Sequence, residues 1–149
     1  MQLEDVILPT SYKYNKDKNV LYVSVQEEPK LDLFDQVMKD INASNDFPPD
    51  VRTIWDFREA DFTSIDSKFE WNIISIKKKY PGRSNARLAI IANNDLSFGM
   101  SRMYAGLAGD FPQNIRVFRG LSEAEEWMLN GKEFDNEPAA SYSGDSGED

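Results

Sequence analysis

The sequence predicts one α/β domain: a single, mainly parallel five-stranded sheet flanked by four helices, with an N-terminal β-hairpin. Three observations support this class. Segments of strand-forming residues alternate with segments whose apolar residues recur every three or four positions, giving the order ββαβαβαβα. Residues 86–92 are nearly all apolar, which is typical of a strand covered on both faces. The first two strand-like runs are separated only by a short polar segment, as in a hairpin.

The hairpin and the first helix come from the first 50 residues. Tyr12 and Tyr14 belong to one run of strand formers and residues 20–25 to the other, with the polar segment 15–19 between them. After Pro29, apolar residues at spacings of three and four predict an amphipathic helix that ends at 45–49. Its apolar stripe consists of Leu31, Phe34, Val37, Met38 and Ile41.

A third strand and a second helix follow. Residues 51–57 predict a strand, and the polar residues 58–61 predict the loop after it. The next helical stripe ends at Pro81 and Gly82, which stop a helix. That stripe consists of Ile65, Phe69, Ile73, Ile76 and Tyr80.

The last two strands and helices complete the alternation. The apolar segment 86–92 is predicted to be the central strand, and 114–118 the fifth strand. Between them, the third helical stripe consists of Leu96, Met100, Met103, Tyr104 and Leu107. Residues 122–125 (SEAE) match a capping box, which predicts a fourth helix beginning at Ser122 with Trp127 and Met128 facing inward.

One domain and a tail account for the whole chain. Residues 1–133 form the predicted domain, and 134–149 contain mainly small and acidic residues that cannot bury a core, so we expect an acidic flexible tail. The chain has 149 residues, the size of a common single domain, and shows no internal repeat.

Composition narrows the chemistry. The sequence contains no cysteine and no histidine, which excludes disulfides, thiolate nucleophiles, Ser-His relays and the usual zinc ligand sets. No GxGxxG, Walker or GxSxG motif occurs. We therefore expect a protein that is not an enzyme, has no catalytic or metal-binding residues, and needs no cofactor.

Charge and hydropathy restrict the partners and the compartment. A net charge of -9 repels nucleic-acid backbones, so no nucleic-acid partner is expected. The longest apolar run is much too short to span a bilayer, which argues against integral membrane association. Residues 1–10 lack the basic and apolar regions of a signal peptide, and with the absence of cysteine this favours a cytoplasmic location. Homodimer formation is left open.

Ligands of open α/β sheets bind where strands end and helices begin. The first candidate loop carries acids, a guanidinium and hydroxyls that could form a ligand site or a switch: Asp56, Arg58, Thr63, Ser64 and Ser67. The simpler interpretation of Thr63 or Ser64 is capping of the second helix.

The second candidate region opens the third helix. Backbone amides near Gly99 and the guanidinium of Arg102 one turn later could hold an anion, with Asp95, Phe98 and Met103 beside them. The alternative is structural: Gly99 would allow close approach of helix and sheet, and the methionines would fill the core.

Two further groups of charges have weaker interpretations. A basic cluster near the end of the second helix predicts a solvated face or a polyanion contact; it consists of Lys77, Lys78, Lys79, Arg83 and Arg87. Asp56, Asp61 and Asp95 could meet at neighbouring strand ends and hold Mg²⁺ for phosphoryl transfer, an unfavoured alternative.

The element order, with 51–57 (VRTIWDF) leading to a hydroxyl-rich helix start, resembles the STAS domains typified by anti-sigma factor antagonists. Residues 87–92 (RLAIIA), 98–103 (FGMSRM) and 117–119 (VFR), followed by 123–127 (EAEEW), resemble the SpoIIAA-like branch of that superfamily. This resemblance covers about residues 11–130. It implies a bacterial, non-enzymatic binding or regulatory module, related in fold to SEC14-type lipid carriers, whose partner is a protein or a small molecule.

The resemblance has one departure. Antagonists carry Asp-Ser-x-Gly after the third strand, where the serine is phosphorylated, whereas residues 66–69 here are DSKF, without the glycine. This argues against the phosphorylation switch. An alternative function is a carrier or sensor of a small apolar or amphiphilic ligand, favoured by apolar side chains at the expected ligand edge. They are Phe62, Phe69, Trp71, Phe98, Met100, Met103 and Tyr104.

Overall fold

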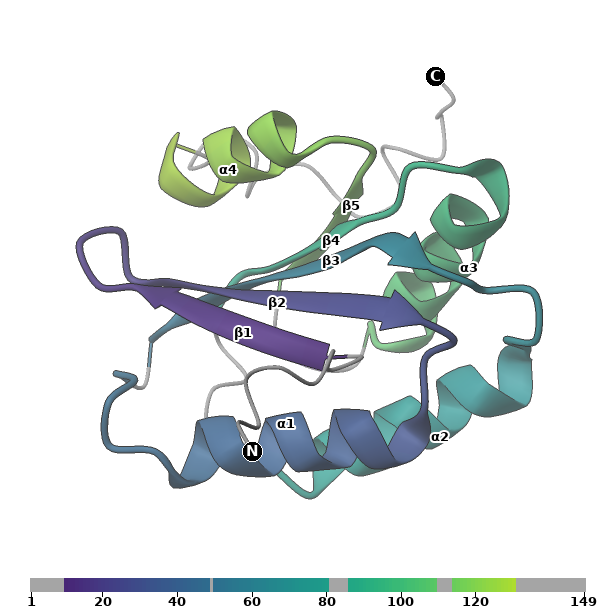
Figure 1. Ribbon diagram of the computed structural model, residues 1–149, viewed down its shortest axis with the longest axis horizontal. Coiled ribbons are helices and arrows are strands. Elements are labelled where there is room, and N and C mark those ends of the chain that lie inside the picture. Colours follow the sequence, from purple (N-terminus) through teal and green to yellow (C-terminus); the bar gives the residue numbers. More distant parts are fainter. Residues whose placement is uncertain (1–9, 49, 81–85, 110–113, 131–149) are drawn as a thin grey trace, which may run out of the picture.

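The computed structural model describes residues 10–48, 50–80, 86–109 and 114–130 (Figure 1). Its elements follow the predicted order ββαβαβαβα. They are β1 (Thr10–Asn15), β2 (Val20–Glu27), α1 (Leu31–Ala43), β3 (Arg52–Ala60), α2 (Ser67–Lys78), β4 (Leu88–Ile91), α3 (Asp95–Leu107), β5 (Ile115–Phe118) and α4 (Leu121–Asn130). The predicted tail, 134–149, and the helix stop at Pro81 and Gly82 lie outside the described residues.

The sheet has the strand order β1-β2-β3-β4-β5, with β1 antiparallel to β2 and all other pairs parallel. The predicted hairpin is therefore confirmed. Its turn contains Asn19 with a φ of 55°, a left-handed conformation that asparagine tolerates. The Asn19 side chain also accepts a hydrogen bond from the Tyr14 hydroxyl at 2.9 Å. The turn is thus tied to the face of β1 on which Tyr14 lies.

The strand predicted to be central is not central. Residues 86–92 contain β4, which is fourth in the sheet, and β3 occupies the middle. Each crossover adds the next parallel strand on the same side, so the sheet grows in one direction from the hairpin. The run is nevertheless apolar for the predicted reason, because all four residues of β4 are buried.

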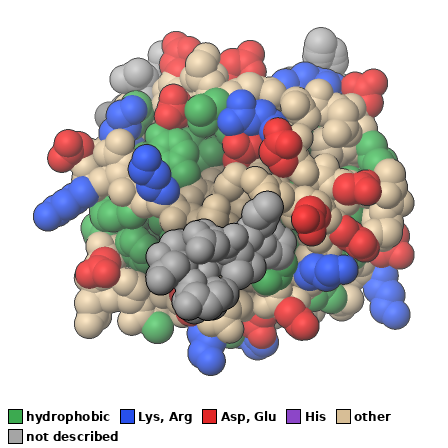
Figure 2. All heavy atoms as spheres, in the orientation of Figure 1, with side chains coloured by type: hydrophobic (Ala, Val, Ile, Leu, Met, Phe, Trp, Pro, Cys, Tyr) green, Lys and Arg blue, Asp and Glu red, His purple; other side chains and the backbone are tan. Residues whose placement is uncertain are grey.

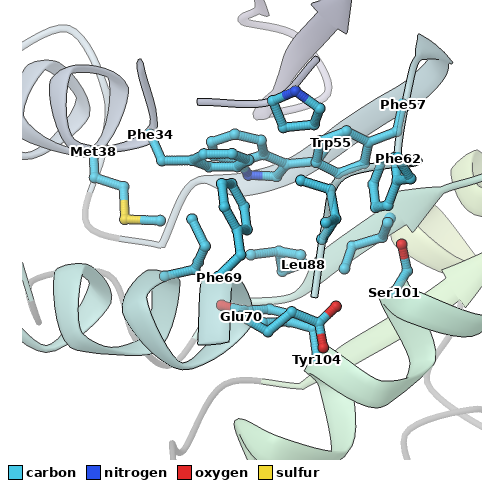
Figure 3. A pocket seen from close by; sticks show the side chains of 14 residues that line it. Phe34, Met38, Trp55, Phe57, Phe62, Phe69, Glu70, Leu88, Ser101 and Tyr104 are labelled. Carbon is cyan, nitrogen blue, oxygen red and sulfur yellow. The ribbon is translucent and has the colours of Figure 1, made fainter. Parts of the chain in front are cut away.

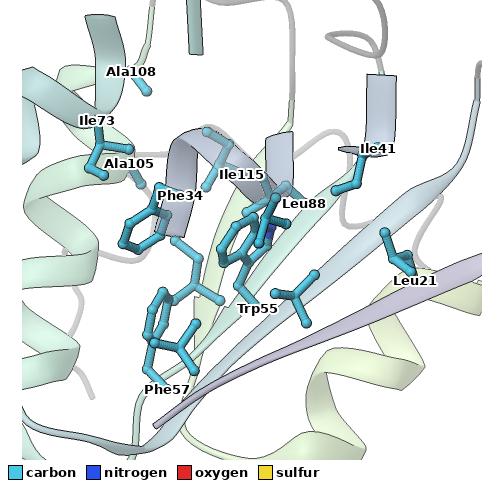
Figure 4. Packing of buried hydrophobic residues seen from close by; sticks show 14 of the residues in the cluster. Leu21, Phe34, Ile41, Trp55, Phe57, Ile73, Leu88, Ala105, Ala108 and Ile115 are labelled. Carbon is cyan, nitrogen blue, oxygen red and sulfur yellow. The ribbon is translucent and has the colours of Figure 1, made fainter. Parts of the chain in front are cut away.

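The same connectivity decides where the helices lie. Right-handed crossovers that all advance in one direction place their helices on one face of the sheet. Accordingly α1, α2 and α3 pack on one face and α4 on the other (Figure 1). The larger core lies under α1, α2 and α3, where Phe34, Trp55 and Leu88 meet (Figure 4).

On the opposite face, α4 packs over a smaller core and is held by polar contacts as well. Trp127 and Met128 are buried there, as predicted. The guanidinium of Arg87 donates to the carbonyls of Trp127 and Met128 at 3.0 and 3.1 Å, and Arg52 also donates to the carbonyl of Met128. These bonds satisfy carbonyls at the end of a helix that has no basic residue in its last turn.

Two predictions about the segment between β3 and α2 were wrong. β3 continues to Ala60, so 58–60 is strand rather than loop, because β2 also continues and pairs with it beyond an irregularity between Ser24 and Gln26. The cap of α2 is Asp66, whose side chain accepts from the Phe69 amide at 2.9 Å, and neither Thr63 nor Ser64.

The capping box at 122–125 does not form either. α4 already begins at Leu121, so Ser122 lies inside the helix. The Glu125 carboxylate instead accepts a hydrogen bond from the Tyr22 hydroxyl at 2.6 Å, which joins α4 to β2.

Candidate functional site

A cavity of about 60 Å³ lies between the sheet and the three helices that cover its larger core. This is several times the roughly 10–15 Å³ that admits one water molecule. Its described lining is almost entirely apolar and comes from α1, β3, α2, β4, α3 and the loops next to them. The lining residues are Pro29, Phe34, Met38, Trp55, Phe57, Phe62, Ile65, Phe69, Glu70, Ile73, Leu88, Ile90, Ser101 and Tyr104.

Aromatic rings form one side of this cavity (Figure 3). Trp55 and Phe57 are alternate residues of β3 and therefore point to the same face of the sheet. Phe34 from α1 stacks on Trp55, with ring centroids 5.2 Å apart and planes 14° apart. Phe62 and Phe69 meet this row edge-on, at 5.3 Å from Phe57 and 6.1 Å from Phe34 respectively. Offset and edge-on packing fixes the rings in place.

Glu70 supplies the one charged side chain among the described lining residues. It comes from the buried face of α2, which it shares with Ile73 and Ile74 at spacings of three and four. The residue is 4% exposed, and its Oε1 atom has no hydrogen-bond partner. Burial in these apolar surroundings raises the pKa of Glu70 from its ordinary value of 4.5 to about 7. Near neutral pH this carboxyl group can therefore gain or lose a proton.

Two hydroxyl groups from α3 lie on the same side of the cavity as Glu70. Ser101 and Tyr104 are one turn apart on one helix face. Burial, and secondarily the charge of Glu70, raises the pKa of the Tyr104 hydroxyl. Tyr104 therefore stays protonated and can donate a hydrogen bond. In Figure 3, Glu70 and Tyr104 lie opposite the row formed by Phe34, Trp55 and Phe57.

The geometry suits noncovalent binding. Apolar walls and aromatic faces would bury the body of a small molecule, and the carboxyl and hydroxyl groups would contact its polar end. Within the described ranges, no group of three or more Asp or Glu side chains could hold a metal ion. In particular, Asp56, Asp61 and Asp95, the alternative Mg²⁺ ligands, do not form such a group.

The first set of predicted site residues lies outside the cavity lining. Asp56 and Arg58 form an ion pair at 2.8 Å near the end of β3. Burial acts to raise the pKa of Asp56, but hydrogen bonds from Arg58 and its charge together outweigh burial, so the pKa is lowered. Thr63 donates to the Asp61 carboxylate at 2.8 Å, and Ser64 donates to Glu28. Ser67 is exposed at the first position of α2. Asp56, Arg58 and Thr63 contact residues two positions away, and Ser64 contacts Glu28, so these side chains do not converge on one point.

The second predicted set gathers around one aromatic ring. Arg119, from the segment after β5, lies 4.2 Å from the Phe98 ring centroid and pairs with Asp95 at 3.1 Å. Arg102 lies 5.8 Å from the same ring. The structure therefore places Asp95, Phe98 and Arg102 near one another, with Arg119 in addition.

The anion seat at Gly99 is not formed. α3 begins at Asp95, and its cap Asn94 accepts from the Ser97 amide at 2.8 Å, so Gly99 lies in the second turn, away from the free amides. The structural alternative for Gly99 is also wrong, because a Cβ atom there would meet nothing within 4 Å. Met103 is 39% exposed and is not core filler.

The predicted basic cluster does not form one surface, because its residues have different surroundings. Lys77 is buried, and this burial lowers the pKa of its amine to about 8. Lys79 pairs with Asp35 at 3.2 Å, and Arg87 binds the end of α4, while Arg83 lies outside the described residues. On the face shown in Figure 2, acidic and basic side chains are intermixed.

Sequence reasoning missed Glu70 and Ser101, the polar members of the cavity. The carrier alternative did name Phe62, Phe69 and Tyr104, which line it. The available signal for Glu70 was its spacing to Ile73, Ile74 and Lys77, which together form the buried face of α2. A glutamate in such a stripe on a helix packed on both sides is a candidate for a buried carboxyl group.

Comparisons with known proteins identify the fold. Comparison with models of protein families gives no match, and neither does comparison with curated proteins. A solved structure matches with a TM-score of 0.56 and 16% sequence identity, over 80% of this chain and 91% of the other. It is an uncharacterized protein of the DUF3478 family from Shewanella loihica PV-4, described as having a SpoIIAA-like fold. The present chain has a SpoIIAA-like fold.

The SpoIIAA-like fold confirms the class expected from the sequence, including the hairpin, the mixed sheet and the four helices. At this level of identity the likeness concerns the fold alone. Separately, none of the helices in the described part of the chain is both long and apolar enough to span a membrane.

Proposed function

We propose that this SpoIIAA-like protein is a non-enzymatic binding module, a carrier or sensor that takes a small apolar or amphiphilic molecule into the aromatic cavity. The observation that carries the proposal is the cavity itself, an apolar space of about 60 Å³ with a buried carboxyl group in its wall. Protein interiors are normally close-packed, so a space of this kind beneath three helices supports a binding function.

The volume and the lining limit the ligand. A space of about 60 Å³ accepts a small group, such as a short alkyl chain or the end of a larger amphiphile. Trp55, Phe57 and Phe62 provide contact surface for an apolar body, and burying that surface is favourable by roughly 25 cal/mol per Å². The three helices that surround the cavity belong to the same face of the sheet, so a ligand there would contact α1, α2 and α3 together.

The test uses neutral apolar probes and a pair of matched variants. We expect 1-butanol to give saturable NMR shifts of the methyl groups of Ile73, Leu88 and Ile90. Ser101→Leu fills the cavity and should abolish these shifts, whereas Ser75→Leu makes the same change at an exposed position of α2 and should retain them.

Shifts that do not saturate, or that persist unchanged in folded Ser101→Leu, would contradict the proposal. If Ser101→Leu does not fold, Ser101→Val reduces the cavity by a smaller step and should weaken binding. Native mass spectrometry of the protein purified from its own host adds an independent measurement. A retained small molecule, lost on denaturation, is the expected result.

A further inference from the structure

We infer that the ligand of this cavity carries an ammonium group, which binds the Glu70 carboxylate and is surrounded by the aromatic rings. The inference rests on the proposed function, since it names the class of molecule that the same cavity would hold. Three properties of the described lining lead to it: a buried carboxyl group whose Oε1 atom has no hydrogen-bond partner, the absence of lysine and arginine, and several aromatic rings.

The first step concerns charge balance. Glu70 is 4% exposed, and its Oε1 atom has no partner. Among the described lining residues there is neither lysine nor arginine. A buried carboxylate without an opposite charge is unfavourable, and pairing with a cation removes most of that penalty. A cationic ligand would therefore supply the charge that the described wall of the cavity lacks.

The second step concerns the other residues that line the cavity with Glu70. From α3 come Tyr104 and Ser101, and the sheet contributes Trp55, Phe57, Leu88 and Ile90, none of them charged. Phe34 and Met38 from α1 also line it, and the remaining lining residues are uncharged as well: Pro29, Phe62, Ile65, Phe69 and Ile73. On α2 itself, Lys77 belongs to the same buried helix face as Glu70, about two turns further on. The lining thus offers aromatic faces and oxygen atoms to a ligand rather than cationic groups.

The third step concerns the rings. Aromatic faces attract cations, and the attraction is strongest where water is excluded. Five rings from α1, β3, α2 and the loop between them line the cavity opposite or beside the carboxylate (Figure 3). Rings with a single carboxylate form a suitable environment for an alkylammonium ion. The same environment repels an anion, and a neutral ligand would leave the charge of the Glu70 carboxylate uncompensated.

Size and long-range electrostatics agree with this class. The cavity of about 60 Å³ suits an amine with a short apolar chain. The net charge of -9 also attracts cations toward the protein before contact. A small aliphatic primary amine therefore satisfies the volume, the rings and the carboxylate at once.

The experiment compares three probes with the same alkyl chain and different charge: n-butylamine, 1-butanol and butyrate. At pH 8 the amine is protonated, as lysine is. We expect n-butylamine to bind the wild type at least about tenfold more tightly than 1-butanol, which corresponds to one charge-assisted hydrogen bond. In Glu70→Gln this preference should fall to about twofold or less, whereas in Glu126→Gln, at an exposed position, it should be unchanged.

The outcomes separate this inference from the proposed function. If 1-butanol and n-butylamine bind the wild type equally, or butyrate binds most tightly, the ammonium inference is wrong while the binding function stands. If none of the three binds in the cavity, both are wrong.

A measurement on the wild type covers the case in which Glu70→Gln does not fold. The ¹³C NMR signal of the Glu70 carboxyl carbon should move to its ionised position on addition of n-butylamine at pH 6.5. It should not do so with 1-butanol. A carboxyl-carbon signal that does not shift when n-butylamine is added would overturn the inference.

Discussion

Glu70 should make the stability of this protein depend on pH in an unusual direction. Burial raises the pKa of Glu70 from 4.5 to about 7 in the folded chain, whereas the unfolded chain titrates near the ordinary value. Between these two values the folded state binds more protons than the unfolded state. Stability from this group therefore falls as pH rises through the interval from about 4.5 to about 7, and stays level above it.

The substitution Glu70→Gln isolates this contribution, because glutamine has nearly the same shape and no charge. The interval between 4.5 and about 7, converted at 1.36 kcal/mol per pH unit, gives about 3 kcal/mol. Relaxation of the protein around a buried charge reduces this effect, so we expect about 2–3 kcal/mol. Glu70→Gln should accordingly be more stable than the wild type by this amount at pH 8 and about equally stable at pH 4.5 or below.

Urea unfolding of both proteins across this pH range measures the difference directly. Carboxylates whose pKa is lowered in the fold, such as Asp35 and Asp56, destabilise both proteins in acid and cancel in the comparison. Glu126→Gln, on the exposed surface of α4, is the matched control and should follow the wild type throughout. A stability difference between Glu70→Gln and wild type that does not change with pH would refute the reasoning, since it would mean that the carboxylate is solvated or paired.

Three further changes test the elements around the site by urea unfolding at pH 7. Asn94→Ala removes the cap of α3 and should destabilise the fold by about 1 kcal/mol, and Asn94→Asp, which retains a capping oxygen, should restore most of this. Arg87→Met removes hydrogen bonds to carbonyls at the end of α4 and should lower stability by about 2 kcal/mol, with faster amide exchange in that helix; unchanged exchange would contradict this. Tyr22→Phe removes the 2.6 Å bond to Glu125 and should lower stability by about 1 kcal/mol, an effect absent if Glu125 is already methionine, which has no oxygen to accept the bond.

The fold was predictable because each element carried its own signal. The stripe of α1 and the apolar run of β4 were recognised from spacing alone, and the crossover rule then fixed a mainly parallel sheet. Boundaries were less predictable where pairing overrides local composition. β3 extends through Arg58 and Glu59 because its partner β2 also continues there, and nothing in the residues 58–60 themselves indicates this.

The candidate site was less predictable for a different reason. Asp56 in β3 and Thr63 in the loop after it attract attention because they are polar, yet each contacts a near neighbour in the chain. Glu70 looks like an ordinary surface residue of a helix in the sequence. α2 packs against α1 and α3, and this packing, which depends on contacts distant in the sequence, buries it. Tertiary burial rather than residue type therefore marks the site.

Buried polar groups have different surroundings on the two faces of the sheet. This contrast supports a function on the face that α1, α2 and α3 cover. Under α4, the guanidiniums of Arg52 and Arg87 donate to backbone carbonyls, and the one unpartnered buried atom described there is the neutral indole nitrogen of Trp127. Under α2, the unpartnered atom belongs to a carboxyl group.

A penalty of about 2–3 kcal/mol at Glu70 is a large share of the roughly 5–15 kcal/mol that stabilises a domain. A leucine or methionine at that position would pack against its apolar neighbours without this penalty. An ionisable group at this position lowers the stability of the fold. Residues that lower stability in this way are expected at functional sites. Glu70 lies in the wall of the aromatic cavity, and we propose that this stability is exchanged for a partner of its carboxylate that comes from outside the chain.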